Sequence, residues 1–140
     1  MEPGLQIRLI YKDQEMVEPR LSAWNGEFGG KADLYHSQGL FAELAQALEG
    51  FPRSAADHRE FALGELAAKG CGGALLRLRT VDLAGHYAIA LTMMTGTRPG
   101  ANQTVDLHAR VEAAAIDDFV GELRRIENEI GPTAILRFAL

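Results

Sequence analysis

The chain has 140 residues, of which 47% are hydrophobic and 24% are charged. This length and composition are typical of one globular domain and exclude a disordered tail, a collagen-like rod and a disulfide-stapled miniprotein. The formal net charge of −5 provides no cationic field to displace counterions from phosphates, so the sequence predicts no nucleic-acid partner.

The cellular compartment is indicated by cysteine usage and by the absence of targeting segments. Cys71 is the only cysteine, which excludes an intrachain disulfide and suits a reducing compartment. The first residues lack the basic start and unbroken apolar run of a secretory signal. No stretch approaches the roughly 18 apolar residues of a membrane span. We therefore expect a cytoplasmic protein with no membrane partner.

The first predicted elements are strands. Residues 5–11 carry apolar side chains at every second position, a period typical of a strand with one buried face. Farther along, Asn25-Gly26 suits a two-residue type I′ hairpin loop, which would pair Trp24 with Glu27. Gly29-Gly30 leave a longer loop open as an alternative. The residues expected on the core face of this hairpin are Leu21, Ala23, Phe28, Ala32 and Leu34.

A short amphipathic helix is predicted between Ser37 and Gly50. The Ser37 hydroxyl is a candidate N-cap, since it can accept a hydrogen bond from an unpaired backbone N–H. Gly50 is a typical C-terminal stop before Phe51-Pro52. The apolar residues at helical spacing are Leu40, Phe41, Leu44 and Leu48.

The middle of the chain is predicted to be an antiparallel meander. Apolar residues alternate with polar or small ones in successive segments, separated by turns at 69–73, 84–85 and 96–102. Such alternation suits an antiparallel sheet with one solvated face rather than a parallel sheet covered on both sides. The alternating apolar residues are Phe61, Leu63, Leu76, Leu78, Tyr87, Ile89, Leu91, Met93, Val105, Leu107, Ala109 and Val111.

The clearest helix lies near the end of the chain, where apolar residues from Ile116 to Ile130 form one stripe. Asp117 and Asp118 are expected in its first turns, where negative charge favours the helix dipole. Gly131-Pro132 ends the helix, and alternating apolar residues then predict a final strand. Residues 1–140 are thus expected to form a single α+β domain, with a mostly antiparallel sheet of about six to eight strands and two amphipathic helices packed on one face.

No catalytic motif is apparent. The glycines at 70–73 precede a strand, whereas a phosphate-binding loop follows a strand and opens a helix. Nothing near Cys71 in the sequence favours an activated thiolate. We therefore expect a non-enzymatic protein with no catalytic residue, metal or cofactor.

One alternative is a metal- or small-ligand-dependent enzyme or ligand-binding protein. No two of the four histidines have the spacing of a short-range zinc motif. However, His86 and His108 are expected on the same polar sheet face, beside Asp106. Two histidines and one carboxylate can bind a transition metal.

The polar face of the meander is the strongest candidate binding surface. The residues expected there are Arg77, Arg79, His86, Thr92, Thr104, Asp106, His108 and Arg110. Trp24 is expected on the non-core face of its hairpin, and arginine and tryptophan are frequent at the centres of protein interfaces. Acidic residues of the last helix are a second candidate surface. The predicted partner-binding residues are Trp24, Arg77, Arg79, His86, His108, Arg110, Asp117 and Asp118.

Several short segments carry a resemblance to known families. They are Phe41-Ala42-Glu43-Leu44, Gly50-Phe51-Pro52, Arg59-Glu60-Phe61, Asp82-Leu83-Ala84-Gly85-His86 and the acidic-capped helix from Glu112 to Ile126. Through them the chain resembles families of small, uncharacterised bacterial α+β proteins, some of which are immunity proteins of polymorphic toxin systems. The resemblance transfers no catalytic residue.

The leading functional hypothesis is a non-catalytic protein-binding module. In the terms of the resemblance, it is an immunity protein that binds and neutralises a cognate toxin in the bacterial cytoplasm. A negatively charged chain would be steered electrostatically towards a cationic partner such as a nuclease. The ligand-dependent alternative remains open, and so does a structural homodimer joined edge to edge or through the open sheet face.

Overall fold

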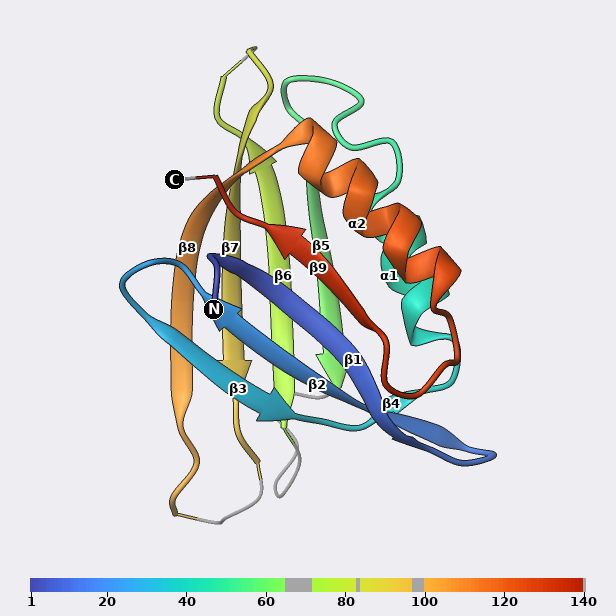
Figure 1. The fold of residues 1–140 in the computed structure, drawn as a ribbon. Helices are drawn as coiled ribbons and strands as arrows, with labels where there is room; N and C mark the ends of the chain where they lie inside the picture. Colours follow the sequence, from blue (N-terminus) through green and yellow to red (C-terminus); the bar gives the residue numbers. More distant parts are fainter. Residues whose placement is uncertain (65–71, 83, 97–99, 140) are drawn as a thin grey trace.

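The computed structural model describes residues 1–64, 72–82, 84–96 and 100–139 (Figure 1). These residues contain two α-helices and nine β-strands. In chain order they are β1 (Gly4–Lys12), β2 (Met16–Trp24), β3 (Gly29–Asp33), β4 (His36–Ser37), α1 (Leu40–Leu48), β5 (His58–Gly64), β6 (Gly73–Thr80), β7 (His86–Met94), β8 (Thr104–Glu112), α2 (Ala113–Arg125) and β9 (Thr133–Arg137).

The strands form two antiparallel sheets. The first sheet has the order β3-β2-β1-β9, with β4 also paired to β2, and the second is the meander β5-β6-β7-β8. The predicted α+β class, the antiparallel strands and the two amphipathic helices are confirmed. The strands are divided between two sheets because β9 pairs with β1 and not with the meander that precedes it.

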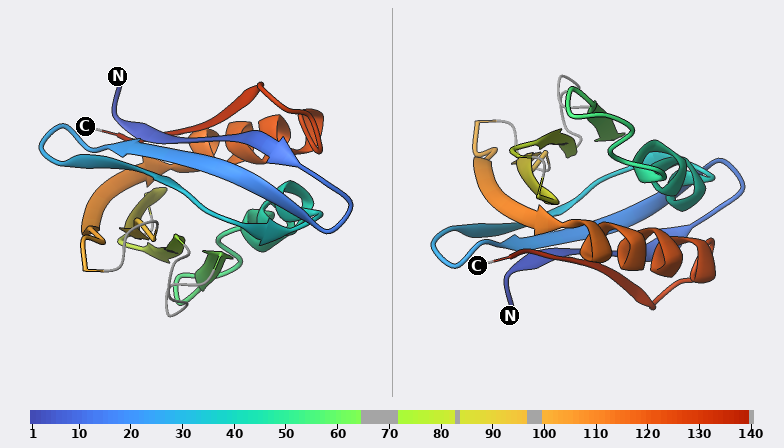
Figure 2. Two further views of the ribbon diagram at one scale, coloured as in Figure 1. Left: turned by 90° about the horizontal axis from the view of Figure 1, so that it is seen from below. Right: turned by 90° about the horizontal axis from the view of Figure 1, so that it is seen from above.

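The two sheets face each other as a wedge. They approach where β3 contacts β7 and β8. On the wider side, α1 and α2 pack against each other, α1 contacts β5 and α2 contacts β9 (Figure 2). Inward-facing side chains of both sheets and the apolar stripes of both helices form one core. Its largest fully buried side chains include Phe41, Phe119, Leu5, Ile7, Leu21, Leu44, Leu76 and Leu78.

The free edge of β8 contacts two other parts of the chain. The Asn25 side-chain amide donates a hydrogen bond to the backbone carbonyl of His108 at 3.0 Å. The backbone N–H of Ala139, just beyond β9, donates to the carbonyl of Arg110 at 2.7 Å. The hairpin loop and the C-terminal segment therefore hold the first sheet against the edge of the second.

The β2–β3 hairpin has a longer loop than the two-residue turn predicted. Trp24 pairs with Gly29, so residues 25–28 form the loop. The Asn25 side-chain oxygen accepts hydrogen bonds from the backbone N–H groups of Glu27 and Phe28, at 2.9 and 2.8 Å, which stabilises this longer turn. Phe28 therefore lies in the loop with 64% of its surface exposed, whereas the other four predicted core residues are buried.

Four details of the predicted elements are wrong. Ser37 does not cap α1, because it pairs with Met16 in β4 and the helix begins after Gly39, without a side-chain cap. Helix α2 begins at Ala113, so Asp117 lies beyond its first turn, and Glu112 provides no side-chain cap. Ile130 lies beyond the helix and is 52% exposed. A bulge after Leu9 turns Tyr11 out to solvent.

The predicted glycine-rich loops lie partly outside the described residues. Cys71, its neighbours 69–70 and the centre of the 96–102 loop lie outside the described residues. The strands on either side of these loops have the predicted alternation. Within the described ranges, neither helix is long and apolar enough to span a lipid bilayer.

Arg59 fastens β5 to the end of α1. Its guanidinium donates to both carboxylate oxygens of Asp57, at 3.0 and 2.9 Å. It also donates to the backbone carbonyls of Ala47 and Glu49, at 2.9 and 3.1 Å. The same group lies 5.5 Å from the centre of the Phe51 ring, a cation–π distance. These contacts fix the outer strand of the second sheet against the helix layer.

This arrangement predicts a specific acid sensitivity. Hydrogen bonds from the Arg59 side chain and from the backbone N–H of Arg53 lower the pKa of Asp57 from 3.8 to about 2. A lowered native pKa stabilises the fold above pH 3.8, and this contribution is lost as the pH falls through about 2. We expect the stability difference between wild type and Asp57→Asn to shrink between pH 5 and pH 2, measured by urea unfolding. A difference that stays constant over this range would contradict the assignment.

Candidate functional site

The outer face of the second sheet is not covered by either helix, because α1 and α2 lie on the inner side of the sheet (Figure 2). The strands pair in sequence order, so their outward residues form rows across the sheet. One row consists of His58, Arg79, Ala88 and Arg110, and the next of Glu60, Arg77, Ala90 and His108. The polar residues predicted on this face therefore lie on it, and their binding role stays a prediction.

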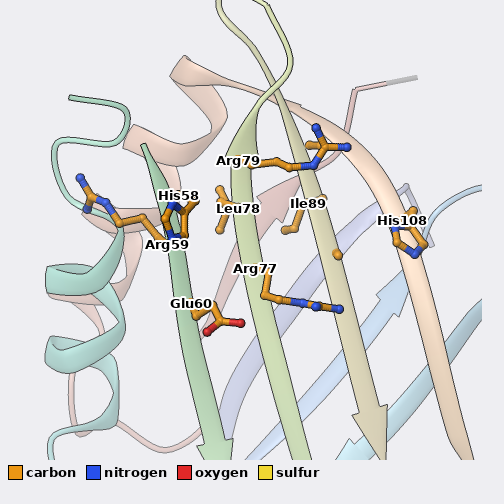
Figure 3. A pocket seen from close by; sticks show the side chains of 10 residues that line it. His58, Arg59, Glu60, Arg77, Leu78, Arg79, Ile89 and His108 are labelled. Carbon is orange, nitrogen blue, oxygen red and sulfur yellow. The ribbon is translucent and has the colours of Figure 1, made fainter. Parts of the chain in front are cut away.

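The two rows form a shallow trough along β7. Ala88 and Ala90 provide its floor, and longer side chains from β6 and β8 form its walls. Figure 3 shows Arg77 and Arg79 extending from β6 across β7 towards β8, with His108 on the far side. A cavity of about 420 Å³, within the size range of ligand sites, lies here and extends to His58 and Glu60 on β5, and Arg110 is not among the residues that line it. We call Arg77, Arg79, Ala88, Ala90, His108 and Arg110 the arginine trough.

The arginines of the trough have no anionic partner among the described residues. The exposed side chains of Arg77, Arg79 and Arg110 form no hydrogen bond or ion pair with any residue in the ranges 1–64, 72–82, 84–96 and 100–139. By contrast, Arg20 on the first sheet binds both carboxylate oxygens of Asp33, at 2.8 and 3.0 Å. The trough thus presents three guanidiniums without an ion-pair partner among the described residues, beside one carboxylate, that of Glu60 opposite Arg77 on β5.

Acidic residues limit the trough at both ends. In the row beyond Ala90, Asp106 accepts a hydrogen bond from the Thr92 hydroxyl at 2.5 Å. In the row beyond Ala88, His86 lies opposite Glu112. The cationic surface along β7 is therefore only two rows long.

His86 has a carboxylate partner of its own. Its Nδ1 atom lies 3.0 Å from the carboxylate of Asp82. Hydrogen bonds from the backbone N–H of Ala84, and then from His86, lower the pKa of Asp82. Asp82 therefore keeps its negative charge beside the histidine, and we do not count His86 in the trough.

The metal-site hypothesis for His86, Asp106 and His108 is not supported by the geometry. His86 lies at one end of β7 and pairs with Asp82, whereas Asp106 binds Thr92 three rows farther along the sheet. Within the ranges described, no three histidine, cysteine or acidic side chains are grouped as metal ligands.

Trp24 does not belong to the same surface as the trough. It lies on the outer face of the first sheet, in register with Gly4 and Gly29. Its ring packs closely over Gly29, where an added Cβ would lie 2.9 Å from the ring. Trp24 is half-buried, as expected of a side chain that covers backbone. It therefore forms part of a separate face.

Asp117 and Asp118 define a third surface, on the exposed side of α2. They line a groove of about 470 Å³ together with Glu122, Arg125 and Arg137. Arg137 lies 3.7 Å from Glu122, so part of the charge in this groove is compensated. The predicted partner-binding residues are thus divided among three faces, and only Arg77, Arg79, His108 and Arg110 come together.

Four outward-facing residues that line the cavity were not predicted from the sequence as site residues. His58 and Glu60 alternate with Phe61 and Leu63 on β5, so the period-two pattern could have placed them on the polar face. Ala88 and Ala90 were passed over as small residues between larger ones. Their smallness leaves the cavity open, which becomes apparent only when the flanking arginines are aligned in register.

Comparison of the chain with protein-family models, with curated proteins and with solved structures found no match.

Proposed function

We propose that the chain is a non-catalytic binding protein that docks an acidic surface of a partner protein on the arginine trough. The observation that supports this most is the set of unpaired guanidiniums around a floor of two alanines. Arginine side chains bind carboxylates with directional, charge-assisted hydrogen bonds. An acidic partner surface would supply the charge that the trough lacks.

The resemblance to immunity proteins suggests a toxin as the partner. On that proposal, docking would neutralise the toxin by occupying its acidic surface. A cationic toxin would instead be expected to contact Asp117 and Asp118 on α2, because opposite charges steer association. The two surfaces therefore make opposite predictions about the partner.

Two matched variants distinguish the surfaces. Arg77→Gln/Arg79→Gln removes positive charge from the trough, and Asp117→Asn/Asp118→Asn removes negative charge from α2. All four side chains are exposed, so we expect both variants to fold. Each tagged variant and the wild type would be used to capture proteins from the native host, and captured proteins would be purified for titration.

We expect the trough variant to weaken partner binding at least about tenfold, and the α2 variant to leave it nearly unchanged. The affinity of the wild type should fall as salt increases, because exposed charge pairs are screened. For a toxic partner, co-expression with the wild type should protect cells and co-expression with the trough variant should not. The reverse pattern, in which only the α2 variant loses the partner, would refute the assignment to the trough.

A further inference from the structure

The dimensions of the arginine trough restrict what it can hold, given the acidic-partner function proposed above. Ala88 and Ala90 are two residues apart on β7, which corresponds to about 6.7 Å along a strand. The backbones of β6 and β8, which carry the flanking side chains, are separated by two inter-strand spacings, or about 9.5 Å. The flanking side chains narrow this space further, which favours a single extended peptide over a helix, whose diameter with side chains is about 10–12 Å.

The nitrogen-bearing side chains of the trough form two separate pairs. Arg79 and Arg110 flank Ala88 from opposite sides. Arg77 and His108 flank Ala90 in the same way, one row farther along β7. Each alanine therefore marks a position where an anion would be approached by a guanidinium from β6 and by a second nitrogen-bearing side chain from β8.

An extended peptide presents alternate side chains on one face. Residues i and i+2 of a strand are separated by about 6.7 Å and point in the same direction. This spacing equals the spacing of the two rows, since the trough is itself built on a strand. Adjacent residues i and i+1 point to opposite faces, so only one of two adjacent carboxylates can reach the floor.

The ends of the trough exclude a longer anion. A third negative charge along β7 would lie next to Asp106 at one end or Glu112 at the other. Two like charges placed side by side on neighbouring strands repel each other and weaken binding. A nucleic acid or a polyphosphate chain would place charges at both ends, whereas a segment with two carboxylates would not.

We propose that the arginine trough binds an extended acidic segment of the partner, with carboxylates at positions i and i+2 placed over Ala88 and Ala90. The segment lies along β7, between the side chains of β6 and β8. This inference deepens the proposed function: it names the chemical pattern that the docking surface recognises.

Short synthetic peptides test the pattern directly. A seven-residue peptide has two glutamates separated by one serine, and its isomer has the same composition with the glutamates adjacent. A third peptide has glutamine in place of both glutamates. Binding to the intact chain is followed by amide chemical shifts, up to about 5 mM peptide. Inorganic pyrophosphate serves as a small phosphate probe.

We expect the alternating peptide to bind at least about fivefold more tightly than the adjacent isomer, and the glutamine peptide not to bind. Shifts should be concentrated at Ala88 and Ala90. Arg77→Gln should weaken binding several-fold, and Arg8→Gln, on the other sheet, should not. Ala88→Leu/Ala90→Leu should also weaken binding although the charge is unchanged, because the larger side chains fill the floor.

Three outcomes would overturn the inference: equal affinity of the two isomers, no peptide shifts in the trough, or pyrophosphate binding there more tightly than the alternating peptide. The last of these would assign the trough to a small phosphate compound. These failures are distinguishable from failure of the proposed function. If partner capture still depends on Arg77 and Arg79, the face docks a partner that does not insert an extended segment.

Discussion

Gly72→Ala is expected to lower the free energy of unfolding by about 3 kcal/mol, because the added methyl group has no space. A Cβ atom at this position would lie 2.5 Å from the backbone oxygen of Asp33 and 3.1 Å from that of Met94. Asp33 belongs to the first sheet and Met94 to the second, so the methyl group must push the two sheets apart. Backbone atoms cannot move aside as the end of a flexible side chain can.

Urea unfolding followed by circular dichroism measures this effect, which corresponds to a fall in Tm of about 10 °C for a domain of this size. Gly121→Ala is the matched control. Gly121 lies in α2 with no atom within 4 Å of the added Cβ, so alanine should stabilise the helix by about 0.5–1 kcal/mol. If Gly72→Ala unfolds at the wild-type urea concentration, the close approach of the sheets at this point is wrong.

Arg59→Met is expected to lower the free energy of unfolding by about 2–3 kcal/mol. Methionine keeps an unbranched apolar side chain but removes every donor of the guanidinium. Asp57 would lose the two hydrogen bonds that it accepts from the Arg59 side chain, and the carbonyls of Ala47 and Glu49 would lose theirs. These groups are partly shielded from water, so water replaces the lost donors only in part.

Arg124→Gln is the control for Arg59→Met. Arg124 also reaches the end of α1, where it forms a 2.9 Å ion pair with the side chain of Glu49. Both side chains of that pair are largely exposed, so its loss should change the free energy of unfolding by about 0.5 kcal/mol or less. Equal destabilisation by the two variants would mean that Arg59 contributes only as a surface charge.

The strands of the second sheet could be predicted because their pattern is local. Tyr87, Ile89, Leu91 and Met93 alternate without interruption, and burial of one face requires this period. The arginines on the opposite face followed from the same alternation. Consecutive antiparallel strands need only short turns, so the order of the meander required no information from distant parts of the chain.

The division into two sheets had no such local signal. Leu5 on β1 pairs with Leu136 on β9, at the other end of the chain. Neither segment contains a signal for its pairing partner, because in both of them apolar residues alternate with other residues and form one buried face. The hairpin length was missed for a related reason: Asn25 binds the loop with its side chain, and a two-residue turn does not require that contact.

The trough itself illustrates a limit of reading residues one at a time. Arg77 and Arg79 stand out in the sequence because they are large and charged. Ala88 and Ala90 do not, yet without them the arginines would lie against other side chains. A cavity forms where small side chains lie beside larger ones in space. Which side chains are neighbours is known only once the strand register is known.

The contacts on the edge of β8 bear on how the molecule avoids unwanted polymerisation. An unpaired edge strand exposes backbone groups that can template a strand from another molecule, the route to domain swapping and fibrils. On β8, the carbonyls of His108 and Arg110 are already occupied by Asn25 and Ala139. An incoming strand would first have to displace the molecule's own hairpin loop and C-terminal segment. His108 and Arg110, whose side chains belong to the arginine trough, thus lie on an edge whose backbone carbonyls are already bonded within the molecule.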